Sequence, residues 1–305
     1  MGLAPRMWLV CGATLLLAAT ACSYEVEPGG LRGRTSARSV GSTPEEGAPP
    51  VSPSTAATGA STTTTTMPVT PPAATPEDDP GPPPPGCGAV QKDADGFFTR
   101  TTAKGPYVGI VPSDYAGQPT RLIVGLHGCG DNPYNFATWA VSPAVTRATQ
   151  DWIAISVGGE TGGGKCWQQS DAAVVLAAID DVSKCFYVHR HQVVLAGFSS
   201  GGELAYGMGL RNASRFAGIL AENTSLTAAG SPATLLAAAS WKLPIAHTAR
   251  TGDTVFPLAG VHADWARIEG AGFQLQHREM AGGHDGVGAD WSDWLIPIGK
   301  TWTSP

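Results

Sequence analysis

Short runs rich in apolar residues recur along the chain from residue 121 onward, and each ends in glycine or polar residues. The runs are "RLIVGLHG" (121–128), "DWIAISVGG" (151–159), "QVVLAGFS" (192–199), "FAGILAEN" (216–223), "LPIAHTARTGD" (243–253) and "FQLQHREMAGG" (273–283). Between the second and third runs, apolar residues fall at helical spacing and predict a helix from Asp171 to Ser183. Continuous apolar strands that alternate with helices indicate an α/β fold, with a mostly parallel central sheet covered by helices on both faces.

Function in such sheets gathers at the carboxyl ends of the strands. The loops that leave the predicted strands there are "HGCGDN" (127–132), "GFSSGG" (197–202), "RTGDTVFP" (250–257) and "AGGHDG" (281–286). We therefore expect the chemistry of the protein to lie in these four loops.

The amino terminus has the form of an export signal. Arg6 precedes an apolar stretch from Met7 to Ala19 that is short for a membrane span, and small residues then lead to Cys22. We expect residues 1–21 to be a signal peptide of the bacterial lipoprotein type, with Cys22 lipidated and the protein held outside the cytoplasm by that anchor. The alternative is ordinary cleavage near Ala21 and a secreted product.

Residues 22–86 are predicted to be a disordered linker. From Gly41 to Gly86 the large apolar residues are few, and Ser, Thr, Pro, Ala and Gly dominate. Such a composition buries too little apolar surface to offset the entropy of ordering, and is typical of a spacer. The predicted globular domain is residues 87–305. With a net charge of -6 and no basic stripe in the sequence, we expect no nucleic-acid partner.

Residues Gly197 to Gly201 fit the pattern G-x-S-x-G, with an apolar strand before them and a helix-like segment after them. This pattern is typical of a sharp strand-to-helix turn that exposes a serine hydroxyl, so Ser199 is the candidate nucleophile. The backbone N–H of Ser200 would then face an oxyanion. The alternative is a glycine-rich helix start without catalytic function.

A serine needs a base and an acid, which should follow it in the chain. His284 lies in the loop after the last predicted strand and is the candidate base. Asp253 ends the strand before it and is the candidate acid. His247, His262 and His277 fall within predicted strands or helices and are interpreted as structural. Asp285 and Asp290 are weaker candidates for the acid.

The loop 127–132 is the candidate source of a second oxyanion donor, the backbone N–H of Cys129, with His127 bracing the loop. Four cysteines lie in the predicted domain, and in an exported protein an even set suggests two disulfides. Three pairings are possible. We prefer Cys129–Cys166, because both follow strands at the predicted active-site edge, which leaves Cys87–Cys185.

The motifs "LHGCGDN", "KCWQQ", "GFSSGG", "TGDTVFP" and "GGHDG" occur in an order that resembles the α/β-hydrolase esterases that include extracellular poly(3-hydroxybutyrate) depolymerases and feruloyl or acetylxylan esterases. The resemblance covers residues 87–305. It implies the α/β-hydrolase fold, a triad of Ser199, Asp253 and His284, and a cleft lined by Trp167, whose alternative is a core tryptophan. The chain departs from that pattern at Ser200, where many members have Ala or Asn, and after His284, where Trp-Pro-Gly is missing. Substrate identity is therefore open.

The sequence thus predicts an exported serine esterase resembling polyhydroxybutyrate depolymerases. Feruloyl or acetylxylan esterase activity and a peptidase on the same fold are the alternatives, and a catalytically inactive surface binding protein is the rival from another class. No cofactor or metal motif is present, so none is expected. The expected partner is an ester substrate, and the membrane is contacted only through the lipid anchor.

Overall fold

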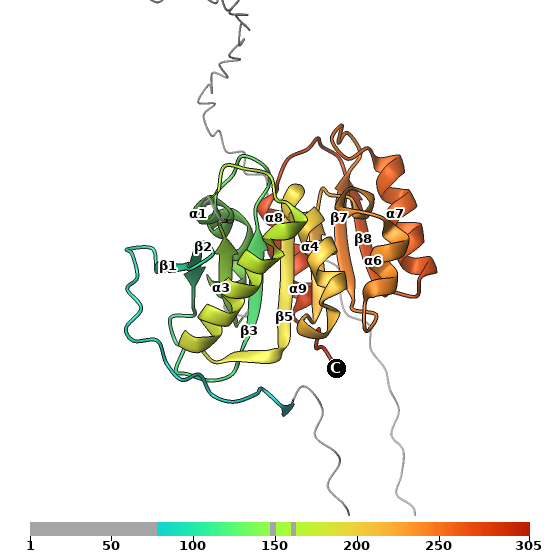
Figure 1. Cartoon of the computed structure of the whole chain (residues 1–305). Helices are drawn as coiled ribbons and strands as arrows, with labels where there is room; N and C mark the ends of the chain where they lie inside the picture. The colour runs from blue at the N-terminus through green and yellow to red at the C-terminus, as the bar shows by residue number, and fades with distance from the viewer. Residues whose placement is uncertain (1–77, 147–150, 160–162) are drawn as a thin grey trace, which may run out of the picture. The chain divides into compact units, whose positions relative to one another are not determined.

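The computed structural model describes residues 78–146, 151–159 and 163–305, and these build one eight-stranded sheet with helices on both faces (Figure 1). The strands follow the spatial order β1-β2-β4-β3-β5-β6-β7-β8. Their bounds are β1 Phe97–Thr102, β2 Gly105–Ile110, β3 Thr120–Leu126, β4 Trp152–Val157, β5 Val188–Phe198, β6 Gly218–Glu222, β7 Ile245–Arg250 and β8 Leu275–Met280.

Most of the sheet is parallel. The strands from β4 through β3, β5, β6 and β7 to β8 pair in parallel, whereas β2 runs antiparallel to both β1 and β4. The six apolar runs of the sequence are the six parallel strands, so the predicted fold class is confirmed. The hairpin of β1 and β2 adds an antiparallel edge.

The helical segments lie between the strands and after the last one, and they cover both faces of the sheet. They are α1 Pro133–Phe136, η2 Ala137–Val141, α2 Pro143–Thr146, η3 Gln169–Asp171, α3 Ala172–Cys185, α4 Ser200–Arg211, η4 Ala213–Arg215, α5 Leu226–Ala229, α6 Pro232–Ala238, α7 Leu258–Gly270, α8 Gly288–Asp290, η5 Trp291–Leu295 and α9 Ile296–Gly299. The helix predicted from Asp171 is therefore α3.

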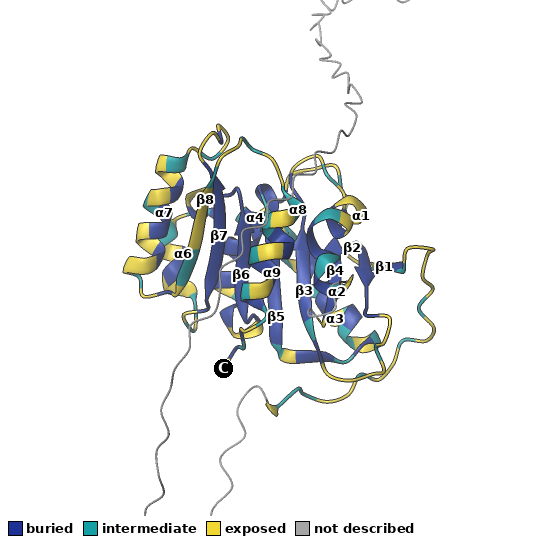
Figure 2. Ribbon diagram, turned by 180° about the vertical axis from the view of Figure 1, so that it is seen from behind, coloured by how far each residue is buried: buried dark blue, intermediate teal, exposed yellow. Residues whose placement is uncertain are grey.

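Two hydrophobic cores lie on the two faces of the sheet. Along β3, Leu122 and Val124 pack into the core under α3 and α4, and Ile123 between them packs into the core under α1 and η5. This alternation follows from the period of two along a strand, and it explains why parallel strands covered on both faces read as continuous apolar runs. Figure 2 shows the inner strands buried, the edge strand β8 partly exposed, and the outer sides of the helices exposed.

Helix α4, which begins immediately after Ser199, is buried around most of its circumference. A Cβ added at Gly209 would lie 2.9 Å from Ile219 of β6, so a glycine lets this helix approach the sheet. At the start of α4, a Cβ added at Gly202 would lie 2.6 Å from the Thr224 side chain, so this end of the helix also lies close to the end of β6.

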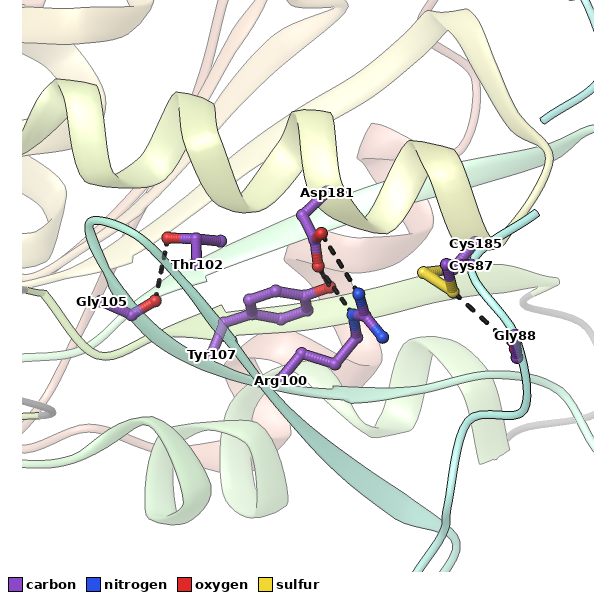
Figure 3. Close-up of polar contacts among 8 residues, drawn as sticks. All are labelled: Cys87, Gly88, Arg100, Thr102, Gly105, Tyr107, Asp181 and Cys185. Atoms are coloured by element: carbon purple, nitrogen blue, oxygen red, sulfur yellow. Dashed lines mark hydrogen bonds and ion pairs between the residues drawn. A yellow bond between two sulfur atoms is a disulfide. The ribbon is translucent and has the colours of Figure 1, made fainter. Parts of the chain in front are cut away.

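The edge hairpin is joined to α3 by a polar cluster (Figure 3). The carboxylate of Asp181 in α3 accepts hydrogen bonds from Arg100 Nε at 2.7 Å and from the buried Tyr107 hydroxyl at 2.8 Å. A disulfide between Cys87 and Cys185 ties the segment before β1 to the end of the same helix. Hydrogen bonding to the Arg100 guanidinium holds the pKa of Asp181 below its usual range, so the carboxylate stays ionised.

Part of the predicted spacer lies against the domain. The backbone oxygen of Pro80 accepts from the N–H of Arg190 at 3.1 Å, and the Tyr187 hydroxyl donates to the oxygen of Gly81 at 2.7 Å. The predicted signal peptide, Cys22 and most of the linker lie outside the described residues. None of the helices in the described ranges is both long and apolar enough to span a membrane.

Candidate active site

Ser199 stands at an abrupt turn between β5 and α4, and its backbone has φ of 53° and ψ of -123°. A positive φ is unfavourable for a residue with a side chain, so neighbouring groups must hold it. The Ser199 N–H donates to the backbone oxygen of Glu222 at 3.1 Å, and the Thr224 hydroxyl donates to the backbone oxygen of Ser199 at 2.9 Å. The strained turn is thus fixed from the end of β6.

The glycines of the motif are required by contact. A Cβ at Gly201 would lie 2.0 Å from the backbone oxygen of Leu126, and one at Gly197 would lie 2.4 Å from the backbone oxygen of Gly201. The end of β3 and the start of α4 therefore touch through backbone atoms. This contact brings the loop after β3 beside the serine.

The three candidate triad residues come together at the carboxyl edge of the sheet. His284 Nε2 lies 2.8 Å from Ser199 Oγ, and His284 Nδ1 lies 2.8 Å from Asp253 Oδ2. An ionised carboxylate only accepts hydrogen bonds, so Nδ1 carries the proton and Nε2 is the acceptor for the serine hydroxyl. This tautomer is the one a general base needs.

The acid and the imidazole are each held in orientation. Asp253, whose side chain is 2% exposed, accepts at Oδ1 from the N–H groups of Val255 at 2.8 Å and Phe256 at 3.0 Å. This leaves Oδ2 for the histidine. The His284 ring stacks on Phe198 at 5.3 Å between centroids, and Phe256 packs against it at 5.4 Å.

The loop after β3 lies against the serine turn. A Cβ at Gly128 would lie 2.7 Å from the Phe198 ring and 3.5 Å from Ser199 Cβ. The next residue, Cys129, is bonded to Cys166. The N–H of Ser200 lies in the first turn of α4, where N–H groups have no intrahelical acceptor. The two N–H groups expected at the oxyanion therefore belong to two segments that meet beside Ser199.

Trp167 is buried, with 7% of the residue exposed, and supports the same loop. Its indole N–H donates to the backbone oxygen of His127 at 2.8 Å, and the two rings lie 5.1 Å apart. His127 is itself buried, and burial lowers its pKa, so it remains neutral. Both residues line a cavity of about 290 Å³. A contact between Trp167 and substrate stays a prediction. The contacts that Trp167 makes in the structure support the loop of His127.

The other histidines and acids have partners away from Ser199. The Trp265 indole N–H donates to His247 Nδ1 at 2.9 Å, and burial lowers the pKa of His247 to about 3. His262 pairs with Glu279 on the surface, and His277 stacks on Trp265. Asp290 pairs with Arg250. These contacts are with side chains outside the candidate triad, and the assignment of the histidines as structural stays a prediction.

Two residues that the sequence analysis did not single out support the histidine loop. Asn223 Nδ2 donates to the backbone oxygen of Asp285 at 2.7 Å, and Glu222 Oε1 accepts from the N–H of Val287 at 2.9 Å. The signal in the sequence was an acid and an amide at the end of a fully apolar strand. Within the part of the chain that the structure describes, no three His, Cys, Asp or Glu side chains gather as they would around a metal ion.

The sequence matches no protein-family model and no curated protein. Comparison with solved structures does find proteins of similar fold. Esterase PE8 is 18% identical, with 62% of this chain and 95% of that chain covered and a TM-score of 0.52. A ferulic acid esterase is 16% identical over 67% of this chain and 97% of that chain, with a TM-score of 0.54.

The fluorophosphonate-binding serine hydrolase FphF of Staphylococcus aureus is 13% identical over 67% of this chain and 96% of that chain, with a TM-score of 0.51. Identities this low establish a common fold and nothing finer. Together with the strand order, they show that this chain has the α/β-hydrolase fold found in these esterases and serine hydrolases.

Proposed function

We propose that this protein is a serine esterase that hydrolyses carboxylic esters, with Ser199, His284 and Asp253 as its triad. The observation that carries the proposal is the pair of contacts made by His284, at 2.8 Å to Ser199 Oγ and at 2.8 Å to Asp253 Oδ2. A catalytically inactive scaffold would have no need to keep this serine at a positive φ. The esterases among the structural neighbours support the same reaction class.

The reaction begins when Ser199 Oγ attacks the ester carbonyl and passes its proton to His284 Nε2. Asp253 stabilises the imidazolium through Nδ1, and the N–H groups of Cys129 and Ser200 donate to the oxyanion. His284 then returns the proton to the leaving alcohol, which departs and leaves an acyl-enzyme. Water, deprotonated by His284, attacks the acyl carbonyl, and collapse of the second oxyanion releases the acid and restores Ser199.

Fluorophosphonate labelling tests the nucleophile. Wild-type protein should form one covalent adduct on Ser199, detected by peptide mass spectrometry, and Ser199→Ala should form none. A matched control is Ser200→Ala, which removes the neighbouring hydroxyl and keeps the backbone N–H. Wild-type protein that takes no label, or Ser199→Ala protein that still does, would remove the proposal.

For the substrate we propose esters of hydroxyalkanoic acids, on the resemblance of the motifs to polyhydroxybutyrate depolymerases. Feruloyl or acetylated sugar esters are the alternative, and the ferulic acid esterase among the structural neighbours supports that alternative. Initial rates on soluble 3-hydroxybutyrate oligomers, methyl ferulate, an acetylated xylooligosaccharide and an N-acetylated peptide separate the candidates. A higher kcat/KM on the ferulate, the acetylated sugar or the peptide would overturn the hydroxyalkanoate assignment.

A further inference from the structure

The loop that carries His284 is attached to the strand ends on both sides of the histidine. Before it, Arg250 Nη1 of β7 donates to the backbone oxygen of Ala281 at 3.0 Å. Immediately after it, Asn223 Nδ2 donates to the oxygen of Asp285 at 2.7 Å. The position of His284 therefore depends on residues at the ends of β6 and β7.

Glu222 makes two further attachments with one side chain. Its Oε1 accepts from the Val287 N–H at 2.9 Å, and its Oε2 accepts from the Trp291 indole N–H at 2.5 Å. The residue is 0% exposed. One carboxyl group thus joins the end of β6 both to the histidine loop and to η5, which follows that loop.

The charges around Glu222 are already balanced without it. Arg250, which is 10% exposed at its side chain, forms an ion pair with the equally buried Asp290. One cation and one anion cancel, so an ionised Glu222 would be a second buried anion without a cation of its own. An uncompensated buried charge is unfavourable enough that a carboxyl in this position takes up a proton instead.

The elements packed around Glu222 carry ionisable groups of both signs. Helix α4 carries Glu203 and Arg211, β7 carries His247 and Arg250, and Lys300 follows α9. The turn after β7 carries Asp253, and the loop and η5 carry His284, Asp285 and Asp293. On β5 the facing residue in the pairing is Phe198. Among the charged groups, the Asp290 carboxylate acts on Glu222, and it favours the neutral form.

We propose that Glu222 is a positioning residue for the esterase reaction, and that its neutral carboxylic acid form holds the His284 loop in place beside Ser199. Loss of its proton makes Glu222 a second carboxylate beside Asp290, and the repulsion between the two pushes the segment that follows His284 away from β6 and moves His284 away from Ser199 Oγ. The protein therefore carries a built-in loss of activity at alkaline pH. This inference rests on the proposed esterase function.

Burial, with the nearby Asp290 carboxylate, raises the pKa of Glu222 to about 8, against the lowering by its N–H donors. The proton is therefore lost within the range in which a serine esterase is ordinarily assayed. A triad by itself needs only a deprotonated histidine, so it gives an activity that rises with pH to a plateau. The descending limb above pH 8 is the part that Glu222 adds.

The test is the pH profile of kcat/KM for a soluble aryl ester between pH 6 and 10, with the rate of Ser199→Ala protein subtracted. Wild-type kcat/KM should fall about tenfold per pH unit above a midpoint near 8, as for a single ionisation. Glu222→Gln keeps a neutral group of the same shape but gives up one of the two acceptor oxygens, so its kcat/KM can start lower and should still show no descending limb. Glu269→Gln, at an exposed site in α7, is the matched control and should follow the wild type. The same descending limb in wild type and Glu222→Gln would overturn the proposal.

A second variant keeps the test decisive if Glu222→Gln does not fold, which its melting temperature at pH 6.5 would reveal. Trp291→Phe removes an N–H donor that favours the ionised carboxylate, so the midpoint of the descending limb should move to higher pH. An unchanged midpoint would also refute the inference. Failure of the esterase function looks different, because wild-type protein would then hydrolyse no ester and bind no fluorophosphonate at any pH.

Discussion

Asp253→Asn is the sharpest test of the triad, because it changes the charge of the acid and keeps its shape. Asp253 Oδ1 would still accept from the N–H groups of Val255 and Phe256, which leaves the new amide nitrogen in the place of Oδ2, 2.8 Å from His284 Nδ1. An amide NH₂ is a donor, so Nδ1 must become the acceptor and the ring proton must move to Nε2. The histidine can then no longer accept the Ser199 proton.

The expected loss is large for activity and small for stability. A wrong tautomer in such a triad lowers kcat by about 10⁴-fold, which corresponds to about 5 kcal/mol of activation free energy. The free energy of unfolding should fall by only about 1–3 kcal/mol, the usual contribution of a hydrogen bond to a charged group. A loss of kcat with little change in melting temperature therefore distinguishes the tautomer effect from general unfolding.

The assay is kcat on a soluble aryl ester at pH 7.5, together with the rate of fluorophosphonate labelling and the melting temperature. Asp285→Asn is the matched control, because Asp285 adjoins His284 in the sequence, is exposed, and contributes its backbone oxygen to Asn223. It should retain activity within a few-fold of the wild type. Asp253→Asn protein that stays within tenfold of wild-type kcat would refute this assignment of the acid.

Three further results are expected. Gly201→Ala should destabilise the protein by about 1–3 kcal/mol or more, the range typical of overpacking, because its Cβ would lie 2.0 Å from the backbone oxygen of Leu126. Gly260→Ala in α7 meets open space and should stabilise the protein by up to about 1 kcal/mol. Urea unfolding compares the two variants. Replacing Cys129 and Cys166 together by Ala opens a loop with a sequence separation of 37 and should lower the free energy of unfolding by about 4 kcal/mol, with a lower kcat because the loop of Cys129 loosens. The folded-state pKa of Glu222 lies above its ordinary 4.5, so the stability that this group contributes is full below pH 4.5 and is lost as pH rises through about 8. The loss amounts to up to about 5 kcal/mol of unfolding free energy. The urea midpoints of wild-type and Glu222→Gln protein should therefore diverge between pH 5 and 9.

The inner parallel strands could be predicted because burial on both faces leaves a direct mark in the sequence. Strands such as β4, buried at every residue, appear as unbroken apolar runs. The edge hairpin was not predicted, because four of the six residues of β1, "FFTRTT", are polar and the strand carries no comparable run. Its attachment depends on Asp181 in α3, which is distant in sequence.

The candidate site was predictable where local geometry demands particular residues. The turn at Ser199 requires glycine at positions 197 and 201, and that need is visible in five consecutive letters. His284 and Asp253 followed from their order after the serine. Glu222 and Asn223 were not found, because their function comes from pairing β6 beside β5 and from the return of the chain at 281–291, which no local pattern reveals.

The end of β6 sets the distance between nucleophile and base, although neither residue belongs to it. The backbone oxygen of Glu222 receives the Ser199 N–H, and the side chain of the same residue receives the histidine loop at Val287. Ser199 is also fixed by its own strand, β5, whereas the histidine loop depends on contacts such as the one at Val287. A change confined to the Glu222 side chain moves only the histidine. For that reason the carboxyl group, and not the strand, is where this site is sensitive to pH.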